Sequence, residues 1–252
     1  MILGFIGTGN IVSDVITGIS KSNISYKKII ISPRNKKKAR FLKKNFKKII
    51  IAKDNQSVID MSDWVFLGVL PRVGESILPK LKFKKNQTVI SFMSTTKYSK
   101  LKKLIKKKII IIRAIPMPPI KHGKGPVAIF PPNKKVKFFF DKIGTTIEVK
   151  NEKLSKNFWA ISGTMASFYE LLAVLSNWLI RKKINKSDAQ KYVTLLYSAL
   201  AELALMNSSK PLKNLVNEQT SGGLNWQGVN QLRKSGYYRL LEKSLMKIYK
   251  RL

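Results

Sequence analysis

Two glycines near the start of the chain have the spacing needed to bind a dinucleotide. The apolar run Ile2–Ile6 leads directly into Gly7-Thr8-Gly9, and an amphipathic stretch follows from Asn10. In such a strand–turn–helix unit the first glycine permits a tight turn, the second lets the backbone approach a pyrophosphate, and the helix N-terminus supplies N–H donors. Val12 stands at the third glycine position of GxGxxG, and we expect its larger side chain to push the helix away from the strand. The predicted contacts are Gly7, Thr8, Gly9, Asn10 and Ile11.

Two cations follow the second predicted strand, in the segment Ser32-Pro33-Arg34-Asn35-Lys36. Enzymes that prefer NAD usually place a carboxylate here to bind the ribose 2′-hydroxyl. This chain has no acidic residue between Asp14 and Asp54. Arg34 and Lys36 are suited to a 2′-phosphate, so the sequence favours NADPH, with NADH as the alternative. In a chain so rich in lysine they could also be ordinary surface cations.

The loops after the later strands complete the expected crevice, because the carboxyl ends of parallel strands face the ligand. Asn55 follows the third predicted strand, and Leu70-Pro71 follows the fourth. The segment Arg113–Pro119 contains three prolines, which make a rigid backbone suited to the wall of a nicotinamide site or to a connecting turn. His122 is flanked by lysines and glycines, which indicates an exposed loop and not a catalytic acid. The further predicted cofactor contacts are Asn55, Leu70, Pro71 and Pro116.

Two groups of hydroxyls and glycines stand in the second half of the chain. Ser162-Gly163-Thr164 lies in a long apolar helical stretch, and Thr220-Ser221-Gly222-Gly223 comes just before a helix. Hydroxyl and backbone N–H groups ahead of a helix form a suitable cradle for a carboxylate. Both groups could instead be simple helix caps.

Alternating strands and helices predict a Rossmann-type, doubly wound α/β domain over residues 1–150. Unbroken runs of Ile and Val indicate strands that are buried on both faces, as in a parallel sheet. The predicted strands are Ile2–Ile6, Lys28–Ser32, Lys48–Ala52, Trp64–Val69, Thr88–Phe92 and Ile109–Ala114, with Pro126–Phe130 and Thr145–Val149 as edge additions. The predicted helices are 11–21, 36–46, 56–61, 73–81 and 97–106.

Helical spacing of apolar residues predicts an all-helical second domain over residues 151–252. The stretch Phe158–Ile180 is apolar nearly all round, so we expect one long helix that must be buried. A small helical domain offers little to bury it against, which indicates a homodimer or higher homo-oligomer formed through this domain. The other predicted helices are Asp188–Met206, Leu212–Val216 and Tyr237–Leu252.

Composition narrows the function classes. The net charge of +36 comes from 49 Lys and Arg against 13 Asp and Glu, which would suit a polyanion. The excess is spread along the chain and is mostly lysine, without interleaved aromatics, so we expect no specific nucleic-acid partner. The absence of cysteine excludes disulfides, thiolate metal sites and cysteine nucleophiles, and we expect no metal. Without a leader or an apolar segment of about 18 residues, we expect a cytoplasmic protein with no membrane partner.

Four motifs occur together in a characteristic order: GFIGTGNI, RAIPMPP, ISGTMASFY and EQTSGGLN. In this order and spacing they resemble the pyrroline-5-carboxylate reductase family over nearly the whole chain. The resemblance implies a Rossmann domain followed by an all-helical dimerisation domain. It also implies hydride transfer from NAD(P)H to the cyclic imine 1-pyrroline-5-carboxylate, which gives proline.

The resemblance also implies roles for the two hydroxyl motifs. The family's TSPGGTT aligns with Gln219–Asn225, with Ser221 in place of proline, and SGSGPAY aligns with Ser162–Phe168. Asn225 and Thr220 would orient the imine ring, Asn225 standing where the family has the hydroxyl that contacts the imine nitrogen. These departures leave open a paralogue that reduces another imine or ketone, and a non-catalytic NADP-binding dimer. The implied substrate-binding residues are Ser162, Thr164, Ser221, Gly222 and Gly223.

Overall fold

The computed structural model describes residues 1–252, which form two compact units. The first unit comprises Met1–Trp159 together with Leu252, and the second comprises Ala160–Arg251. The predicted division after residue 150 precedes this one, because helix α7 (Glu152–Ser162) begins in the first unit and ends in the second.

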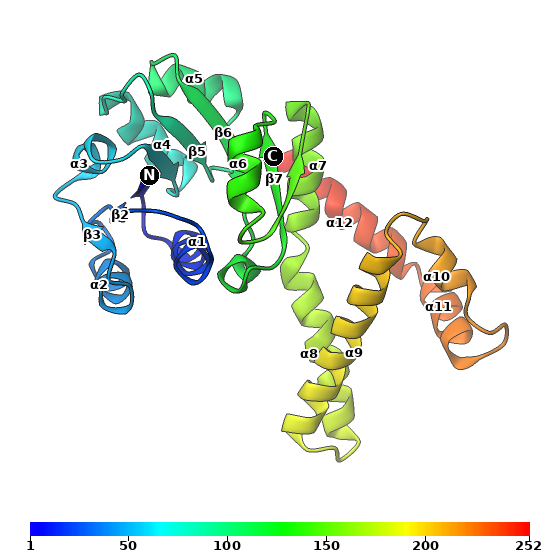
Figure 1. Cartoon of the computed structure of the whole chain (residues 1–252). Helices are drawn as coiled ribbons and strands as arrows, with labels where there is room; N and C mark the ends of the chain where they lie inside the picture. The colour runs from blue at the N-terminus through cyan, green and yellow to red at the C-terminus, as the bar shows by residue number, and fades with distance from the viewer. The chain divides into compact units, whose positions relative to one another are not determined.

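The first unit is built on an eight-stranded sheet with the strand order β3-β2-β1-β4-β5-β6-β7-β8 (Figure 1). All neighbouring strands are parallel except β6 and β7, which are antiparallel. This confirms the predicted Rossmann-type sheet, and the two added strands extend it at the β6 edge. The strands are β1 Ile2–Ile6, β2 Lys28–Ile31, β3 Ile49–Ile51, β4 Trp64–Leu67, β5 Thr88–Ser91, β6 Ile110–Ile115, β7 Pro126–Phe130 and β8 Thr145–Glu148.

Helices of the first unit differ from the prediction in three places, one of which is the 3₁₀ helix η2, absent from the predicted elements. The predicted helix 73–81 is divided into α4 and the 3₁₀ helix η1, because Pro79 cannot continue the α-helical hydrogen bonding. Helix α6 is absent from the predicted elements, and Asn133 caps its start by accepting a hydrogen bond from the Val136 N–H at 3.0 Å. The helices are α1 Asn10–Lys21, α2 Lys36–Asn45, α3 Asn55–Asp60, α4 Pro71–Ile77, α5 Tyr98–Ile105, α6 Lys134–Phe140, η1 Leu78–Lys80 and η2 Pro118–His122.

Apolar side chains cover both faces of the sheet. On β2, Ile29 and Ile31 belong to a core that includes residues of α1, α2 and α6, whereas Ile30 belongs to a second core that includes residues of α3 and α5. All three isoleucines are fully buried. The strands are therefore buried on both faces, as their lack of alternation predicted.

The second unit is helical throughout, as predicted, but the expected single helix over 158–180 is wrong. The chain breaks at Gly163 and Thr164, whose N–H groups bond back to Ala160 and Ile161 in a tight turn. A Cβ atom at Gly163 would lie 3.1 Å from the side chain of Ile248, so glycine allows α12 to approach the turn. The helices that follow α7 are α8 Met165–Arg181, α9 Lys186–Met206, α10 Lys213–Asn217, α11 Leu224–Lys234 and α12 Tyr237–Arg251.

The apolar stretch around this turn is poorly covered by the chain itself. Phe168, Val174 and Trp178 on α8 are 45%, 52% and 53% exposed, although α8 packs against α9. By length and composition, Glu152–Arg181 also meets the requirement for a membrane span, with a mean hydropathy of 1.4 in its best window. The expectation that no segment reaches this requirement is corrected, since it considered unbroken apolar runs only. One such stretch is weak evidence for a span, and the break divides it into two helices.

Candidate functional site

A crevice of about 630 Å³ lies at the carboxyl ends of β1, β2 and β4. These strands are neighbours in the sheet, and the strand order reverses direction between β1 and β4. Open α/β sheets bind their ligands at such a reversal. The residues that line the crevice are Gly7, Thr8, Gly9, Arg34, Asn35, Lys36, Gly68, Val69, Leu70 and Val73.

The glycine turn has the backbone conformation that its sequence predicts. Gly7 adopts a φ of +96°, and a Cβ atom there would lie 2.5 Å from the carbonyl oxygen of Gly68. The Gly7 N–H donates to Ser32 Oγ at 2.8 Å, which ties the turn to the end of β2. Gly9 is the N-cap of α1 and offers no side-chain acceptor, so the first N–H groups of this helix face the crevice uncapped.

The side chain of Val12 is accommodated at the end of the neighbouring strand β4. Its side chain is fully buried, and a Cβ atom at Gly68 would lie 2.0 Å from Val12 Cγ2. The missing side chain at Gly68 therefore makes the room that the third glycine of the motif usually provides. Val12 was expected to displace the helix, whereas Gly68, which lies inside the predicted strand Trp64–Val69, accommodates its side chain.

The crevice fits a nicotinamide dinucleotide. Thr8 Oγ1 is buried without a hydrogen-bond partner. It lies directly in the turn, where a phosphate oxygen would accept a hydrogen bond from it. Above Gly9 the space is open, since a Cβ atom there would have its nearest neighbour at 4.0 Å. Arg34 and Lys36 are exposed at the rim and provide positive charge beside this opening.

Other predicted cofactor contacts lie outside the lining of this crevice. Asn10 accepts a hydrogen bond from Lys38 Nζ, and Ile11 follows it on α1. Asn55 is the first residue of α3, after the N-cap Asp54, and Pro71 is the first residue of α4, after the N-cap Leu70. Pro116 is buried between β6 and η2. The lining also includes Val69, which precedes Leu70 at the end of the fourth predicted strand, and Asn35, Gly68 and Val73, which the sequence motifs did not single out.

The predicted substrate cradle of the second unit is a turn that leads into α11. Gly222 has a φ of +75°, and the Gly223 N–H donates to the Thr220 carbonyl at 3.0 Å. Gly223 is the N-cap of α11 and supplies no side-chain cap, while Thr220 and Ser221 are exposed. Asn225 Nδ2 donates to Gln219 Oε1 at 2.9 Å. The turn thus presents hydroxyls and helix N–H groups to solvent, as a carboxylate cradle requires.

The other hydroxyl motif lies at the turn between α7 and α8. Thr164 Oγ1 donates to the Ile161 carbonyl at 2.7 Å, so this hydroxyl takes part in the turn. This geometry agrees with the helix-cap interpretation of the motif. A substrate role for Ser162 and Thr164 stays a prediction.

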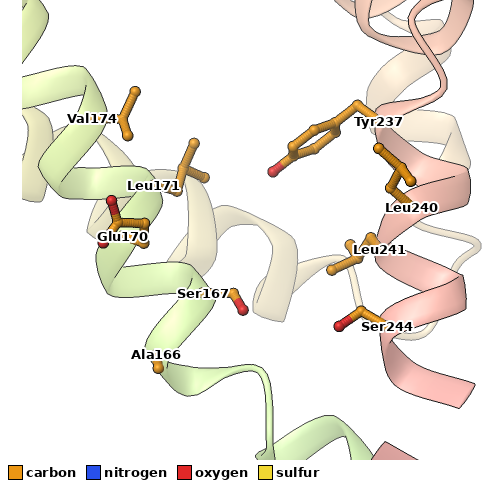
Figure 2. A pocket seen from close by; sticks show the side chains of 9 residues that line it. All are labelled: Ala166, Ser167, Glu170, Leu171, Val174, Tyr237, Leu240, Leu241 and Ser244. Atoms are coloured by element: carbon orange, nitrogen blue, oxygen red, sulfur yellow. The ribbon is translucent and has the colours of Figure 1, made fainter. Parts of the chain in front are cut away.

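An apolar groove of about 680 Å³ runs between α8 and α12 in the second unit. Figure 2 shows Glu170, Leu171 and Val174 on α8 across an open gap from Tyr237 and Leu241 on α12. The residues predicted to bind substrate do not line this groove. It therefore represents a second, mostly apolar surface of the helical unit.

Comparison with known proteins extends the likeness over the whole chain. Residues 2–95 match the family described as NADP oxidoreductase, coenzyme F420-dependent. The pyrroline-5-carboxylate reductase of Synechocystis sp. is 25% identical over 259 residues, which cover 99% of this chain and 96% of that protein.

Solved structures show the same fold. The 1-pyrroline-5-carboxylate reductase of Streptococcus pyogenes is 22% identical, with a TM-score of 0.84 over 99% of this chain and 97% of that one. The Plasmodium falciparum pyrroline carboxylate reductase with NADP bound is 21% identical, with a TM-score of 0.85 over 98% and 95% of the two chains. The motifs, the two-unit fold and the full-length sequence similarity agree, and the chain is similar to pyrroline-5-carboxylate reductases over nearly its whole length.

Proposed function

We propose that this protein reduces 1-pyrroline-5-carboxylate to proline with NADPH as the hydride donor. The observation that carries the proposal is the crevice at Gly7–Gly9 with Arg34 and Lys36 at its rim, in a chain with full-length similarity to pyrroline-5-carboxylate reductases. The absence of a carboxylate after β2 favours NADPH, and NADH is the alternative.

Binding geometry supplies most of the catalysis in this proposal. The nicotinamide supplies a hydride to the imine carbon, and the nitrogen gains its proton from water or arrives protonated. The uncapped N-terminus of α1 and Thr8 Oγ1 bind the pyrophosphate, while Arg34 and Lys36 bind the 2′-phosphate. No strong side-chain acid is required, since the reaction needs orientation more than proton transfer from the protein.

The turn before α11 holds the substrate. Ser221 Oγ and the Gly222 N–H donate to the substrate carboxylate, and Gly223, whose own N–H closes the turn, brings the carboxylate to the positive end of the α11 dipole. Asn225 and Thr220 orient the ring, and Asn225 can turn its amide from Gln219 to the imine nitrogen. Ser162 and Thr164 complete the proposed substrate contacts.

The proposed assembly is a cytoplasmic homodimer, or a higher homo-oligomer, formed through the helical unit. The exposed apolar residues of α8 and the groove beside α12 support it, because a partner subunit would remove this surface from water. We propose no specific nucleic-acid partner and no membrane partner.

Reduction of the imine is tested by the loss of NADPH absorbance with 1-pyrroline-5-carboxylate, and by identification of proline as the product. Turnover of other cyclic imines or ketones but not of this one would identify a paralogue, an alternative that the changed residues Met165, Ser221 and Asn225 favour. Tight NADPH binding without turnover of any imine would contradict the enzymatic proposal and indicate a non-catalytic dimer.

A further inference from the structure

One buried cation of the first unit has no role in the proposed chemistry. Arg113 stands in the otherwise apolar strand β6 and is 2% exposed. Its Nη1 donates to Glu152 Oε1 at 2.5 Å, and its Nη2 donates to the Ser94 carbonyl at 2.6 Å. Its guanidinium lies over the ring of Trp159, 3.9 Å from the centroid. Burial lowers the pKa of Arg113 to about 10, although Glu152 opposes the shift, so the group stays charged at neutral pH.

Glu152 connects the same cluster to the start of α5. Its Oε1 also accepts a hydrogen bond from the Tyr98 N–H at 2.6 Å, and Lys97, the N-cap of α5, provides no side-chain cap of its own. Arg113 and Glu152 therefore hold both ends of the loop 94–98, one at the Ser94 carbonyl and the other at the Tyr98 N–H. We call Arg113, Glu152 and Trp159 the clamp.

The loop that the clamp holds lies at the edge of the sheet where the crevice opens. It follows β5, which pairs with β4, and the segment Gly68–Leu70 after β4 lines the crevice. Its neighbour Met93 packs against α4, since a Cβ atom at Gly74 would lie 2.4 Å from Met93 Cε. The 2′-phosphate side of the crevice is at β2, so the nicotinamide side extends toward β4 and β5.

We infer that the clamp is a positioning device for the hydride-transfer step, in which Arg113 and Glu152 fix the 94–98 loop beside the nicotinamide half of the crevice. This inference rests on the proposed function. The clamp does not touch the glycine turn or the rim cations, so its loss leaves most cofactor contacts intact. Its effect is expected on the turnover rate, because a small misplacement of the reacting groups slows a reaction that depends on orientation.

The test compares Glu152→Ala with Glu152→Gln. The glutamine amide oxygen can still accept from Tyr98 and Arg113, whereas alanine removes both bonds. We expect Glu152→Ala to lower kcat by about 10- to 100-fold while the Kd of NADPH changes less than about threefold, and Glu152→Gln to recover most of kcat. Arg113→Lys, which keeps the charge but loses the planar fork and the stacking on Trp159, should resemble Glu152→Ala.

Amide hydrogen exchange at 94–98 gives a readout that does not depend on turnover. Exchange should be faster in Glu152→Ala than in the wild type, and close to wild type in Glu152→Gln. The control is Arg181→Lys at the exposed end of α8, which should change neither exchange nor kcat. Unchanged kcat in Glu152→Ala, or a parallel rise in the Kd of NADPH, would overturn the inference. If the wild type reduces no imine, the proposed function fails, and the exchange data alone decide whether the clamp holds the loop.

Discussion

Cofactor choice in this crevice depends on single side chains at the rim. Replacing Arg34 and Lys36 by serine should weaken NADPH binding by about 100-fold or more, because each of the two charge-assisted hydrogen bonds to a 2′-phosphate contributes about 1.5–3 kcal/mol. NADH lacks this phosphate, so its Kd should hardly change. Fluorescence titration with both nucleotides measures the ratio of the Kd of NADPH to the Kd of NADH.

The neighbouring exposed residue Lys37 provides the matched control, since it lies outside the crevice lining. Lys37→Ser should leave the ratio of the two Kd values as it is in the wild type. If the affinities for NADPH and NADH fall equally in the Arg34 and Lys36 variant, these cations attract the nucleotide without binding the 2′-phosphate specifically.

The pair Val12 and Gly68 is expected to be strongly coupled. Gly68→Ala places a methyl group against Val12 Cγ2, at a backbone position that cannot shift without moving β4, so the free energy of unfolding should fall by about 1–3 kcal/mol. Val12→Ala should relieve this cost when it is combined with Gly68→Ala. Urea denaturation of the two single variants and the double variant measures the coupling.

Additive effects of the two substitutions would contradict this packing. The glycine turn itself stays unchanged in these variants, so NADPH binding serves as a check that the double variant retains the crevice.

At the scale of elements, the sheet was largely predictable and the short helices were not. In strands such as Lys28–Ile31, the residues Ile29–Ile31 form an unbroken run of apolar β-branched side chains, which identifies both the type of the element and its burial on two faces. Helix α6 has seven residues and depends on the Asn133 cap and on packing of Phe139 and Phe140, which no helical period reveals. At the break between α7 and α8, Gly163 leaves room for Ile248 of α12, a contact between distant parts of the sequence.

The residues of the candidate site were likewise predictable from the sequence only in part. The glycine turn is a local motif, so its residues and its conformation followed from the sequence. Gly68 and Asn35 line the crevice because the strand order brings β2, β1 and β4 together. The clamp required the partner of Arg113, which lies 39 residues away at Glu152. The one sequence signal for it was a cation inside an apolar strand.

The connection between α6 and β8 predicts a pH dependence of stability. Burial raises the pKa of Asp141, but hydrogen bonds from Lys137 and from Thr146 outweigh it and hold the pKa below its ordinary 3.8. A depressed carboxyl pKa stabilises the folded state above pH 3.8, and this contribution is lost as the pH falls through the folded-state pKa. Because the pair is partly exposed, Asp141→Asn should cost about 0.5–1 kcal/mol at pH 7.

Urea denaturation at several pH values tests this linkage. The difference between wild type and Asp141→Asn should shrink as the pH falls below 3.8. A difference that stays constant into acid would show that Asp141 acts through packing and not through its charge.

At the scale of the whole molecule, two properties of the chain oppose each other in a homodimer. The helical unit exposes large apolar side chains that favour association, while each copy carries a net charge of +36 that opposes it. Charge repulsion between copies is long-ranged and is screened by salt, whereas burial of apolar surface persists. The dimer should therefore become tighter as salt rises from about 0.01 to 0.15 M, since the Debye length falls from about 30 to 8 Å.

The groove between α8 and α12 is where this association should be most sensitive to charge. Leu240→Glu places a carboxylate on the groove wall, and an unpaired buried charge should raise the dimer Kd by about 100-fold or more. Met61→Glu is the matched control, because Met61 is an exposed apolar residue of the first unit. Light scattering across a dilution series measures both variants. A monomeric wild type would contradict the homodimer, and equal dimer affinity in both variants would place the interface away from this groove.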